Sequence, residues 1–362
     1  MRKIIDECFF QIQNGANIKQ GKVDGGFPIT RIETIANDRF NRDRMGYAGI
    51  TDLSKYESYI LEDEDLLMSH INSMQYLGRT VLYKKQDDEI IIHGMNLLRL
   101  RANRDIIIPG YAKYYFYGHS FRSQLRNIMK KSVNQASFAV KDLKKIKMEI
   151  PCLREQQKLV QVLDKIQKII DVKTKEIAKF DELVSARFVE MFGDPITNSK
   201  LLPIEKIEER YFLKAGITTK AEDIHDYLKD KYEIPCYGGN GIRGYVENLS
   251  YEGCYPIIGR QGALCGNVQY ATGKFHATEH AVLVSILKND NTMWVYYMLK
   301  LMDLYRYHTG AAQPGLAVKK LNTIDVIVAD INLQNQFATF VHQVNKSKFV
   351  IHKFLYCTTH NT

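Results

Sequence analysis

One segment occurs twice in the chain, first as Gln135-Ala136-Ser137-Phe138-Ala139-Val140-Lys141-Asp142-Leu143 and again, without gaps, as Gln313-Pro314-Gly315-Leu316-Ala317-Val318-Lys319-Lys320-Leu321. The offset between the copies is 178 residues, 313 minus 135. The same offset pairs Ile146 with Ile324, Gln156 with Gln334 and Leu159 with Phe337. A repeat of this length predicts two copies of one structural unit in tandem.

Each copy is followed by apolar positions in alternating steps of four and three residues, which is the heptad spacing of coiled-coil helices. The first seam comprises Leu159, Leu163, Ile166, Ile170, Ile177, Phe180 and Val184, with Lys173 at its one polar place. The second comprises Phe337, Val341, Val344, Lys348, Ile351 and Leu355. Two ordinary amphipathic helices, each packed on its own domain, would give one such seam apiece. Because the seams match, we favour an antiparallel coiled coil that holds the two domains at opposite ends.

The helix boundaries give a division of the chain into four parts. The first helix should begin near Pro151, since proline is acceptable at a helix start, and stop at Gly193-Asp194-Pro195. It would be about 60 Å long at 1.5 Å per residue. The second should end by about Tyr356, so the first seam from Phe180 onward has no offset partner. We predict domains at 1–150 and 196–330, a long helix at 151–195 and a shorter one at 331–362.

Within the domains, short runs of β-forming residues precede aromatic-rich stretches typical of helices, so we predict an α+β fold for each. The expected strands are 90–93, 97–100, 255–259 and 281–285, and the expected helical stretches are Tyr111 to Met129 and Trp294 to Tyr307.

Composition and charge restrict the class of protein. A chain of 362 residues, 45% hydrophobic and 25% charged, has room for two globular domains. No run of 18 apolar residues and no signal-peptide pattern occurs, so we expect a cytoplasmic protein without a membrane span. The six cysteines are scattered without a C-x-x-C pair, which favours reduced thiols over a zinc or disulfide framework. The net charge of +9 lies mainly in residues 1–150, with 24 basic and 18 acidic residues, and is compatible with a polyanionic partner.

Two glycine-rich loops in the second domain carry polar side chains suited to DNA. Gly239-Asn240-Gly241-Ile242-Arg243-Gly244 fits G-x-G-x-x-G, but Pro235 before it and the extended Tyr245-Val246 after it differ from the strand and helix of a dinucleotide site. A surface loop close to phosphate, projecting Tyr237, Asn240 and Arg243, and a simple hairpin turn both remain open. Arg260 and Gln261, between Gly259 and Gly262, can pair with guanine and adenine edges.

A third polar segment, Phe275-His276-Ala277-Thr278-Glu279-His280, admits three interpretations: a metal site, a recognition strand or ordinary structural histidines. On a strand His276 and His280 would share a face while Glu279 points away, which leaves a metal without a third ligand. We therefore count His276, Thr278 and His280 as candidates for DNA contact. The first domain has similar but weaker segments, with the candidates His70, Asn72, Arg79, His93 and Asn96.

Several catalytic motifs are missing from the sequence. It has no Walker A lysine motif, no H-E-x-x-H, no G-x-S-x-G, and no Asn/Asp-Pro-Pro-aromatic tetrapeptide of the kind that amino-methyltransferases use on a flipped base. We therefore predict a protein with neither catalytic residues nor a metal site of its own. A DNA-modifying enzyme with an unrecognised site and a coiled-coil scaffold that does not bind DNA are the alternatives.

Taken together, four segments give the chain a strong resemblance, over nearly its whole length, to the specificity subunits of type I restriction-modification systems. They are Pro151 to Gln157, Glu190 to Pro195, Tyr237 to Tyr245 with Gly259 to Gly262, and the Gln-x-x-x-Ala-Val-Lys segment that occurs twice.

The resemblance implies two target recognition domains, each reading one half of a split double-stranded DNA sequence. Paired helices would set their spacing and seat two methyltransferase subunits, and restriction subunits would join the same complex. S-adenosylmethionine, ATP and Mg²⁺ would then be bound by those partners, and this chain would hold no cofactor.

Overall fold

The 178-residue repeat reappears in the hydrogen bonds of the computed structural model, which describes residues 1–133, 135–229, 231–310 and 314–360. Gln313, where the second copy begins, lies outside the described residues, as do residues 361 and 362 of the predicted second helix. The backbone N–H of Ile5 donates to the carbonyl of Ile146 at 2.9 Å, and that of Ile207 donates to the carbonyl of Ile324 at 2.9 Å. Ile146 and Ile324 are offset partners, so the start of each copy is hydrogen-bonded to an equivalent residue near its end.

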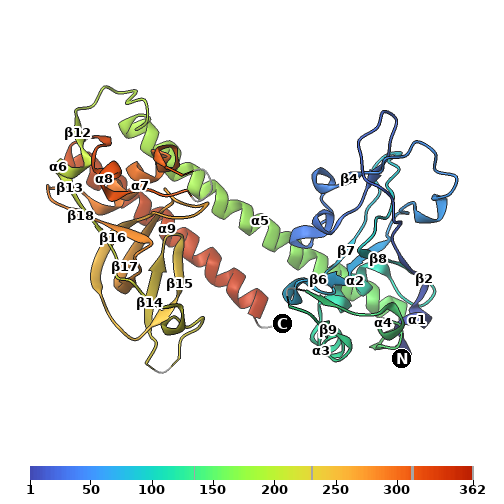
Figure 1. The fold of residues 1–362 in the computed structure, drawn as a ribbon. Coiled ribbons are helices and arrows are strands. Elements are labelled where there is room, and N and C mark those ends of the chain that lie inside the picture. The colour runs from blue at the N-terminus through green and yellow to red at the C-terminus, as the bar shows by residue number, and fades with distance from the viewer. Residues whose placement is uncertain (134, 230, 311–313, 361–362) are drawn as a thin grey trace. The chain divides into compact units, whose positions relative to one another are not determined.

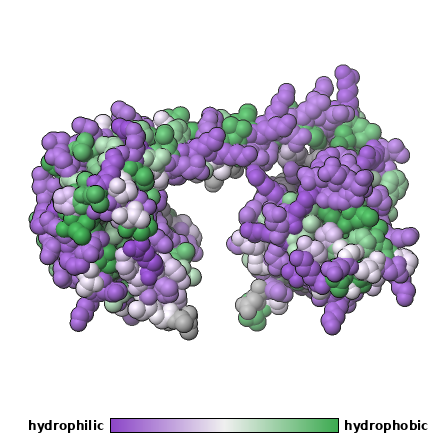
Figure 2. Space-filling view, turned by 90° about the horizontal axis from the view of Figure 1, so that it is seen from above, coloured by the Kyte–Doolittle hydropathy of each residue, from purple (hydrophilic) through white to green (hydrophobic). Residues whose placement is uncertain are grey.

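The chain divides into two compact units, Met1–Ile169 (unit 1) and Ile170–Thr362 (unit 2). The long helix α5 (Leu153–Phe192) belongs partly to each, and α9 (Ile331–His360) belongs to unit 2 (Figure 1). None of the helices in the described part of the chain is long and apolar enough to cross a bilayer, and hydrophilic residues dominate the face shown in Figure 2.

Unit 1 is built on a four-stranded antiparallel sheet in the order β2-β8-β5-β7. Its strands are β2 (Phe9–Asn14), β8 (Leu97–Ala102), β5 (Leu66–Ser69) and β7 (Thr80–Leu82). Helices α2 (Pro109–Tyr117) and α3 (His119–Ile128) cover one face and share a hydrophobic core with it. The other face packs against the 3-10 helix Ile32–Asp38 and neighbouring loops. The sheet is therefore buried on both sides.

Smaller elements complete unit 1. They are β1 (Arg2–Ile4) paired with β11 (Lys147–Glu149), β3 (Pro28–Ile29) with β4 (Gly46–Tyr47), β10 (Ala136–Ser137) between β6 (Ile71–Asn72) and β9 (Lys130–Lys131), α1 (Ile5–Cys8), α4 (Val140–Leu143), and the 3-10 turns Arg42–Arg44, Glu57–Tyr59 and Met74–Tyr76.

Unit 2 has a larger sheet of six strands in the order β13-β18-β16-β17-β14-β15, antiparallel except between β14 and β17. The strands are β13 (Tyr211–Ala215), β18 (Ala281–Ile286), β16 (Tyr251–Gly259), β17 (Val268–Ala277), β14 (Ile234–Gly238) and β15 (Gly241–Val246). Around it lie β12 (Ile204–Lys206) paired with β19 (Asp325–Ile327), α6 (Ile207–Arg210), α7 (Thr292–Leu301), α8 (Val318–Asn322), and the 3-10 turns Ala221–Asp223 and Leu304–Tyr307.

In unit 2 the two long helices run antiparallel and contact each other. Phe337 of α9 meets the rings of Phe188 and Phe192 of α5 at 5.4 and 5.9 Å between centroids. Further along α9, Lys348 pairs with Asp181 of α5 at 2.7 Å. The contacts move backward along α5 as they move forward along α9, which is antiparallel pairing. The predicted fold class, two α+β domains with long paired helices, is confirmed.

A buried glutamine ties the first turn of each long helix to its unit. The Gln156 side chain accepts from the backbone N–H of Ile108 at 2.8 Å and donates to the carbonyls of Ile106 at 2.9 Å and Pro151 at 3.0 Å. Its offset partner Gln334 accepts from the N–H of Asn291 at 2.8 Å and donates to Asp290 and the carbonyl of Ala329. The two glutamines therefore fix equivalent junctions between helix and domain.

Four expectations about individual elements need correction. The helical stretch predicted from Trp294 to Tyr307 is interrupted after Leu301, where α7 ends, and continues as the separate 3-10 turn Leu304–Tyr307. The strand predicted at 90–93 is absent, because Ile92 forms only isolated bridges to Ile29 and Ile60. The helical stretch from Tyr111 to Met129 is broken at Gly118 into α2 and α3. Helix α9 continues beyond the predicted Tyr356 to His360.

Candidate nucleic-acid interface

The polar segments of the second domain meet at one end of the unit 2 sheet, where β16 ends and β18 begins. The backbone N–H of Arg260 donates to the carbonyl of His280 at 3.0 Å, and that of Thr278 donates to the carbonyl of Tyr237 at 2.9 Å. The backbone is so close that a Cβ on Gly259 would lie 2.1 Å from the carbonyl oxygen of Gly239. The glycines therefore allow segments far apart in sequence to lie side by side.

The G-x-G-x-x-G segment forms a hairpin. It joins β14 to β15, which are antiparallel, whereas a dinucleotide fingerprint needs a strand followed by a helix. Asn240 is exposed at the turn, and its side-chain oxygen accepts a hydrogen bond from the amide of Asn267. Arg243 is exposed on β15, and the half-buried ring of Tyr237 packs edge-on against Phe275. The dinucleotide alternative does not fit this geometry, and the hairpin alternative does.

The charges at this strand end leave two arginines free. Glu279 accepts from the N–H of Thr219 at 3.2 Å and lies 3.3 Å from Nε2 of His280. Neither Arg243 nor Arg260 forms an ion pair within the part of the chain that the structure describes. The buried Nε of Arg260 and Nδ1 of His280 also lack a described hydrogen-bond partner. Unpaired buried polar atoms are costly, so this strand end is suited to a hydrogen-bonding ligand.

Two of the unit 2 candidates are buried and cannot contact DNA. His276 is enclosed, with Nε2 2.8 Å from the hydroxyl of Thr219 and Nδ1 bonded to the hydroxyl of Ser250, and burial lowers its pKa. Thr278 is fully buried. His276 and His280 do not share a strand face either, because β17 ends at Ala277 and a turn follows. We therefore remove His276 and Thr278 from the candidates and retain Gln261, which is exposed.

Unit 1 has an equivalent strand end. The carbonyl of His70 accepts from the N–H of Phe138 at 3.2 Å, as the carbonyl of Arg260 accepts from Leu316 at 2.8 Å. Phe138 and Leu316 are partners at the 178-residue offset, so His70 and Arg260 occupy equivalent positions. Two further pairs follow from the same bonding pattern. Arg79 is equivalent to Asn267, because the carbonyl of each accepts a hydrogen bond from the final residue of β5 or β16. Asn96 is equivalent to His280, because they directly precede β8 and β18.

The unit 1 candidates differ in what their side chains can do. His70 is half-buried against Phe138, burial lowers its pKa, and its Nδ1 has no described hydrogen-bond partner. Asn72 accepts from the N–H of Ser73 at 2.8 Å. Asn96 is partly accessible in a left-handed turn with φ of 77°. Each of these three keeps some accessible surface at or near the strand end.

His93 is an ordinary core histidine and was wrongly predicted to face DNA. Its side chain is 0% exposed, and Nε2 lies 3.0 Å from the carbonyl oxygen of Leu97. Burial, and secondarily the charge of Arg99, lower its pKa to about 3, so it is neutral at physiological pH. The equivalent residue in unit 2 is Ala277. The carbonyl of His93 accepts from the N–H of Ala16, just after β2, and the carbonyl of Ala277 accepts from the N–H of Ile217, just after β13.

The helix-pairing residues form a gradient of burial. Val184, Phe337, Val341 and Val344 are buried in the unit 2 core, with Phe180 packed against it. Ile170, Ile177, Ile351 and Leu355 are half-buried. In unit 1, Leu163 and Ile166 are half-buried, and Leu159 is 44% exposed. The end of the first seam, which has no offset partner, therefore packs into the unit 2 core, to which Phe337, Val341 and Val344 of α9 also belong.

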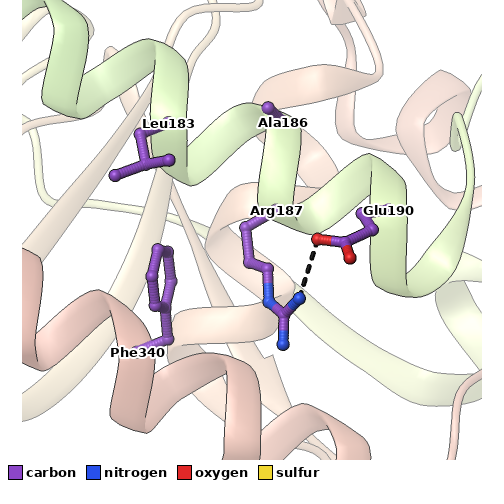
Figure 3. Close-up of a pocket in the computed structure, with 5 residues that line it drawn as sticks. All are labelled: Leu183, Ala186, Arg187, Glu190 and Phe340. Atoms are coloured by element: carbon purple, nitrogen blue, oxygen red, sulfur yellow. Dashed lines mark hydrogen bonds and ion pairs between the residues drawn. The ribbon is translucent and has the colours of Figure 1, made fainter.

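A shallow hollow of about 560 Å³ is lined by residues of both helices of this pair. Figure 3 shows Leu183, Ala186, Arg187 and Glu190 of α5 around it, with Phe340 of α9 on the opposite side. Arg187 bonds to Glu190 at 2.7 Å and lies 6.0 Å from the centre of the Phe340 ring. All of these residues belong to the helix pair, and none of the strand-end candidates lines the hollow.

Two residues near the strand ends are not among the candidates predicted from the sequence. Asn267 belongs to the unit 2 strand end, and Asp38 pairs with Arg79 at 2.9 Å in unit 1. Asn267 follows a glycine in the same loop region as Arg260, which is a weak signal. Asp38 lies 41 residues before Arg79, and no local pattern connects the two.

Comparison with known proteins gives one consistent family. A family model described as "Type I restriction modification DNA specificity domain" matches residues 7–181 and 213–355. The Escherichia coli "Type I restriction enzyme EcoprrI specificity subunit" is 35% identical over 251 residues, which are 63% of this chain and 60% of that protein. The "Putative type I restriction enzyme MjaX specificity subunit" of Methanocaldococcus jannaschii is 32% identical over 198 residues, 55% and 46% of the two chains. The matches thus span about half to 60% of these relatives.

Two solved structures share the fold. The type I restriction-modification S subunit from M. genitalium has a TM-score of 0.56 at 15% identity, over 99% of this chain and 92% of that one. A chain from a structure titled "Structural basis underlying complex assembly and conformational transition of the type I R-M system" has a TM-score of 0.54 at 13% identity, over 99% and 93%.

Proposed function

Since the chain belongs to the family of type I restriction-modification DNA specificity domains, we propose that it is the subunit that reads the DNA target in such a complex. Each unit would read one half of a split sequence in double-stranded DNA through its strand end. In unit 1 the readers would come from His70, Asn72, Arg79 and Asn96, and in unit 2 from Tyr237, Asn240, Arg243, Arg260, Gln261 and His280.

One observation carries this proposal most directly: the two units present hydrogen-bonding side chains at equivalent positions. His70 and Arg260 directly follow the equivalent strands β5 and β16. Asn96 and His280 directly precede the equivalent strands β8 and β18. Imidazole, amide and guanidinium groups are the ones that recognise base edges and phosphates. Two such ends on one chain suit a target with two separated halves.

The helix pair is the surface that we propose for the protein partners. Two methyltransferase subunits and the restriction subunits would dock on this chain and carry the chemistry, with S-adenosylmethionine, ATP and Mg²⁺ bound in those partners. This chain would need no cofactor or metal of its own. A subunit with this task would work in the cytoplasm, beside the genome.

The test is to produce the chain with the methyltransferase subunits of its restriction system and to map methylated adenines across the host genome. We expect one two-part sequence with a fixed gap between its halves. Methylation without a sequence preference, or a single uninterrupted motif, would contradict the proposal.

Two alternatives have their own readouts. The purified chain alone, given DNA, S-adenosylmethionine and Mg²⁺, should neither methylate nor cut. Turnover that a point substitution in this chain abolishes would favour the enzyme alternative. A complex that assembles on the chain and still does not bind DNA would favour the scaffold alternative.

A further inference from the structure

Arg79 of unit 1 is a candidate whose side chain is held by two other side chains before any DNA binds. Its guanidinium lies 4.2 Å from the centre of the Tyr76 ring, and its Nε pairs with Oδ1 of Asp38 at 2.9 Å. Only 16% of the Arg79 side chain is accessible. Because Asp38 takes the Nε–H, and no described residue bonds to Nη1 or Nη2, the end of the guanidinium fork stays available.

Asp38 is itself fixed in place. The hydroxyl of Tyr117 donates to its Oδ1 at 2.8 Å and also lies 3.0 Å from the carbonyl oxygen of Thr80. Asn37 and Asp38 both have φ of 57°, a left-handed conformation that asparagine and aspartate tolerate better than most residues. The side-chain amide of Asn41 donates to three carbonyls around this turn, those of Thr34, Ala36 and Arg39. The turn thus delivers a carboxylate to Arg79 from a distant part of the chain.

Unit 2 treats the equivalent position in the same way. Asn267, the counterpart of Arg79, donates from its amide to the side chain of Asn240 in the hairpin turn. In each unit, therefore, a polar side chain at the strand end is tied to a second loop. The two loops are unrelated in sequence, and the arrangement is shared.

We propose that Asp38 is a positioning residue that orients Arg79 toward a guanine in the half-site read by unit 1, an inference that rests on the proposed function. Two adjacent donors of arginine match O6 and N7 of guanine in the major groove. An arginine that is already fixed loses less conformational entropy when it binds, and its fork meets the base in one orientation. Asp38 has 54% of its side chain exposed, and exposed ion pairs contribute little to stability. Its effect should therefore appear in base preference and leave thermal stability nearly unchanged.

The test uses the full chain in complex with its methyltransferase subunits and measures binding to a DNA library randomised in both half-sites. Arg79→Ala should abolish the preference at one base pair of one half-site. Asp38→Ala should reduce that preference about three- to tenfold at the same base pair and leave the other half-site unchanged. The double variant should match Arg79→Ala, because Asp38 acts only through Arg79. Asp38→Asn should restore part of the preference, since an amide oxygen still accepts from Nε.

Two further variants keep the test decisive. Asp43→Ala removes an exposed acid of the same segment whose side chain has no ion pair or hydrogen bond to any described residue, and it should change nothing. If Asp38→Ala fails to fold, Tyr117→Phe removes the bond that holds Asp38 and should weaken the preference at the same base pair.

Several outcomes would overturn the inference alone. They are an unchanged preference in Asp38→Ala, equal weakening on all sequences, or effects of Asp38 and Arg79 at different base pairs, each with the unit 2 half-site still read. An unsubstituted complex that prefers no sequence in either half-site would overturn the proposed function, and this inference with it.

Discussion

The two units carry different chemistry at equivalent positions, both at the strand end and inside the sheet. At the strand end unit 1 has the imidazole of His70, whose pKa is lowered by burial, whereas unit 2 has the guanidinium of Arg260. Inside, Leu67 of β5 faces Arg99, while its counterpart Ile257 of β16 faces Leu283. The glutamine that attaches each long helix to its unit is the same in both copies of the repeat. Equivalent positions of the two sheets, in contrast, carry different residues.

The buried Arg99 makes the interior of unit 1 depend on a polar network. Arg99 and Asp65 are each 1% exposed, with Nε and Oδ2 3.9 Å apart. The guanidinium also donates to Gln11 and Gln13 at 2.7 Å and to the carbonyls of Ser58 and Ile60. Leu283 needs none of these partners, because it lies in an apolar cluster. The same sheet position is thus satisfied by hydrogen bonds in one unit and by packing in the other.

The largest effect should come from exchanging a whole unit. Replacing residues 196–330 with the matching segment of a relative should change one half-site completely and leave the other intact, because each strand end is built within its own unit. Methylation mapping of the exchanged chain with its partner subunits checks this. A change in both halves would show that the units do not read independently.

Removing the buried carboxylate should destabilise unit 1 by about 3–5 kcal/mol, because Asp65→Ala leaves Arg99 buried with a charge that lacks its counter-ion. Denaturant-dependent hydrogen exchange, which separates peptides of unit 1 from those of unit 2, measures the free energy of unfolding. Asp88→Ala, at an exposed site with no ion pair or hydrogen bond to any described residue, should stay within about 0.5 kcal/mol of the unsubstituted chain. An equal loss in both units would argue against this account.

The two free arginines of unit 2 should behave differently from each other. Arg260 is half-buried at the strand end, so Arg260→Ala should cost about 1–3 kcal/mol of binding to the preferred sequence and relax one base pair. Arg243 is exposed on the hairpin, and we expect a phosphate contact. Arg243→Ala should therefore weaken binding to all sequences and make the salt dependence shallower. Binding measured at several salt concentrations, with Lys55→Ala at an exposed site of unit 1 as a charge-matched control, checks both. If neither substitution affects binding, these loops lie outside the interface.

The smallest effect concerns His93, which Ala277 replaces in unit 2. Its pKa is lowered from 6.5 to about 3 by burial, so the unfolded chain takes up a proton below pH 6.5 and the folded chain does not. The stability that neutral His93 allows is present above pH 6.5 and is lost as the pH falls toward 3. Between about pH 7 and pH 5.5 unit 1 should lose about 1 kcal/mol through this residue.

The matched pair for this measurement is His93→Gln and His119→Gln, the latter at an exposed site on α3. The free energy of unfolding of unit 1 should differ less between the two pH values in His93→Gln than in the unsubstituted chain. In His119→Gln the difference should be the same as in the unsubstituted chain. A pH dependence that survives His93→Gln would assign it to another group.

Features that follow from regular spacing could be predicted from the sequence. The repeat, both seams and the antiparallel helix pair depend on heptad steps and on matched residues such as Gln156 and Gln334, which need no knowledge of the sheets. The glycine-flanked candidates Arg260 and Asn240 could also be predicted from the sequence, because glycines mark the places where the chain turns tightly.

Features that depend on packing between distant segments could not be predicted. Whether His93 or Asn96 faces solvent is decided by the loops that cover the strand end, and those loops have no periodic pattern. The pairing of Asp38 with Arg79 likewise requires a turn built from two left-handed residues far away in sequence. The predicted strand at 90–93 failed for a related reason: Ile92 is buried, and it forms one bridge to Ile29 of β3 and one to Ile60 instead of a continuous ladder.

The glutamine that joins each long helix to its unit has a consequence for how such chains can diversify. Among the described residues, the Gln156 side chain bonds only to backbone groups of unit 1, and that of Gln334 bonds to backbone groups and to Asp290. Backbone amides and carbonyls are present whatever side chains the domain carries. A domain acquired by recombination, or altered by many mutations, can therefore be joined to the same helix provided that its chain passes the glutamine at the same place. The strand end that we propose reads DNA could then change while the junction stays constant.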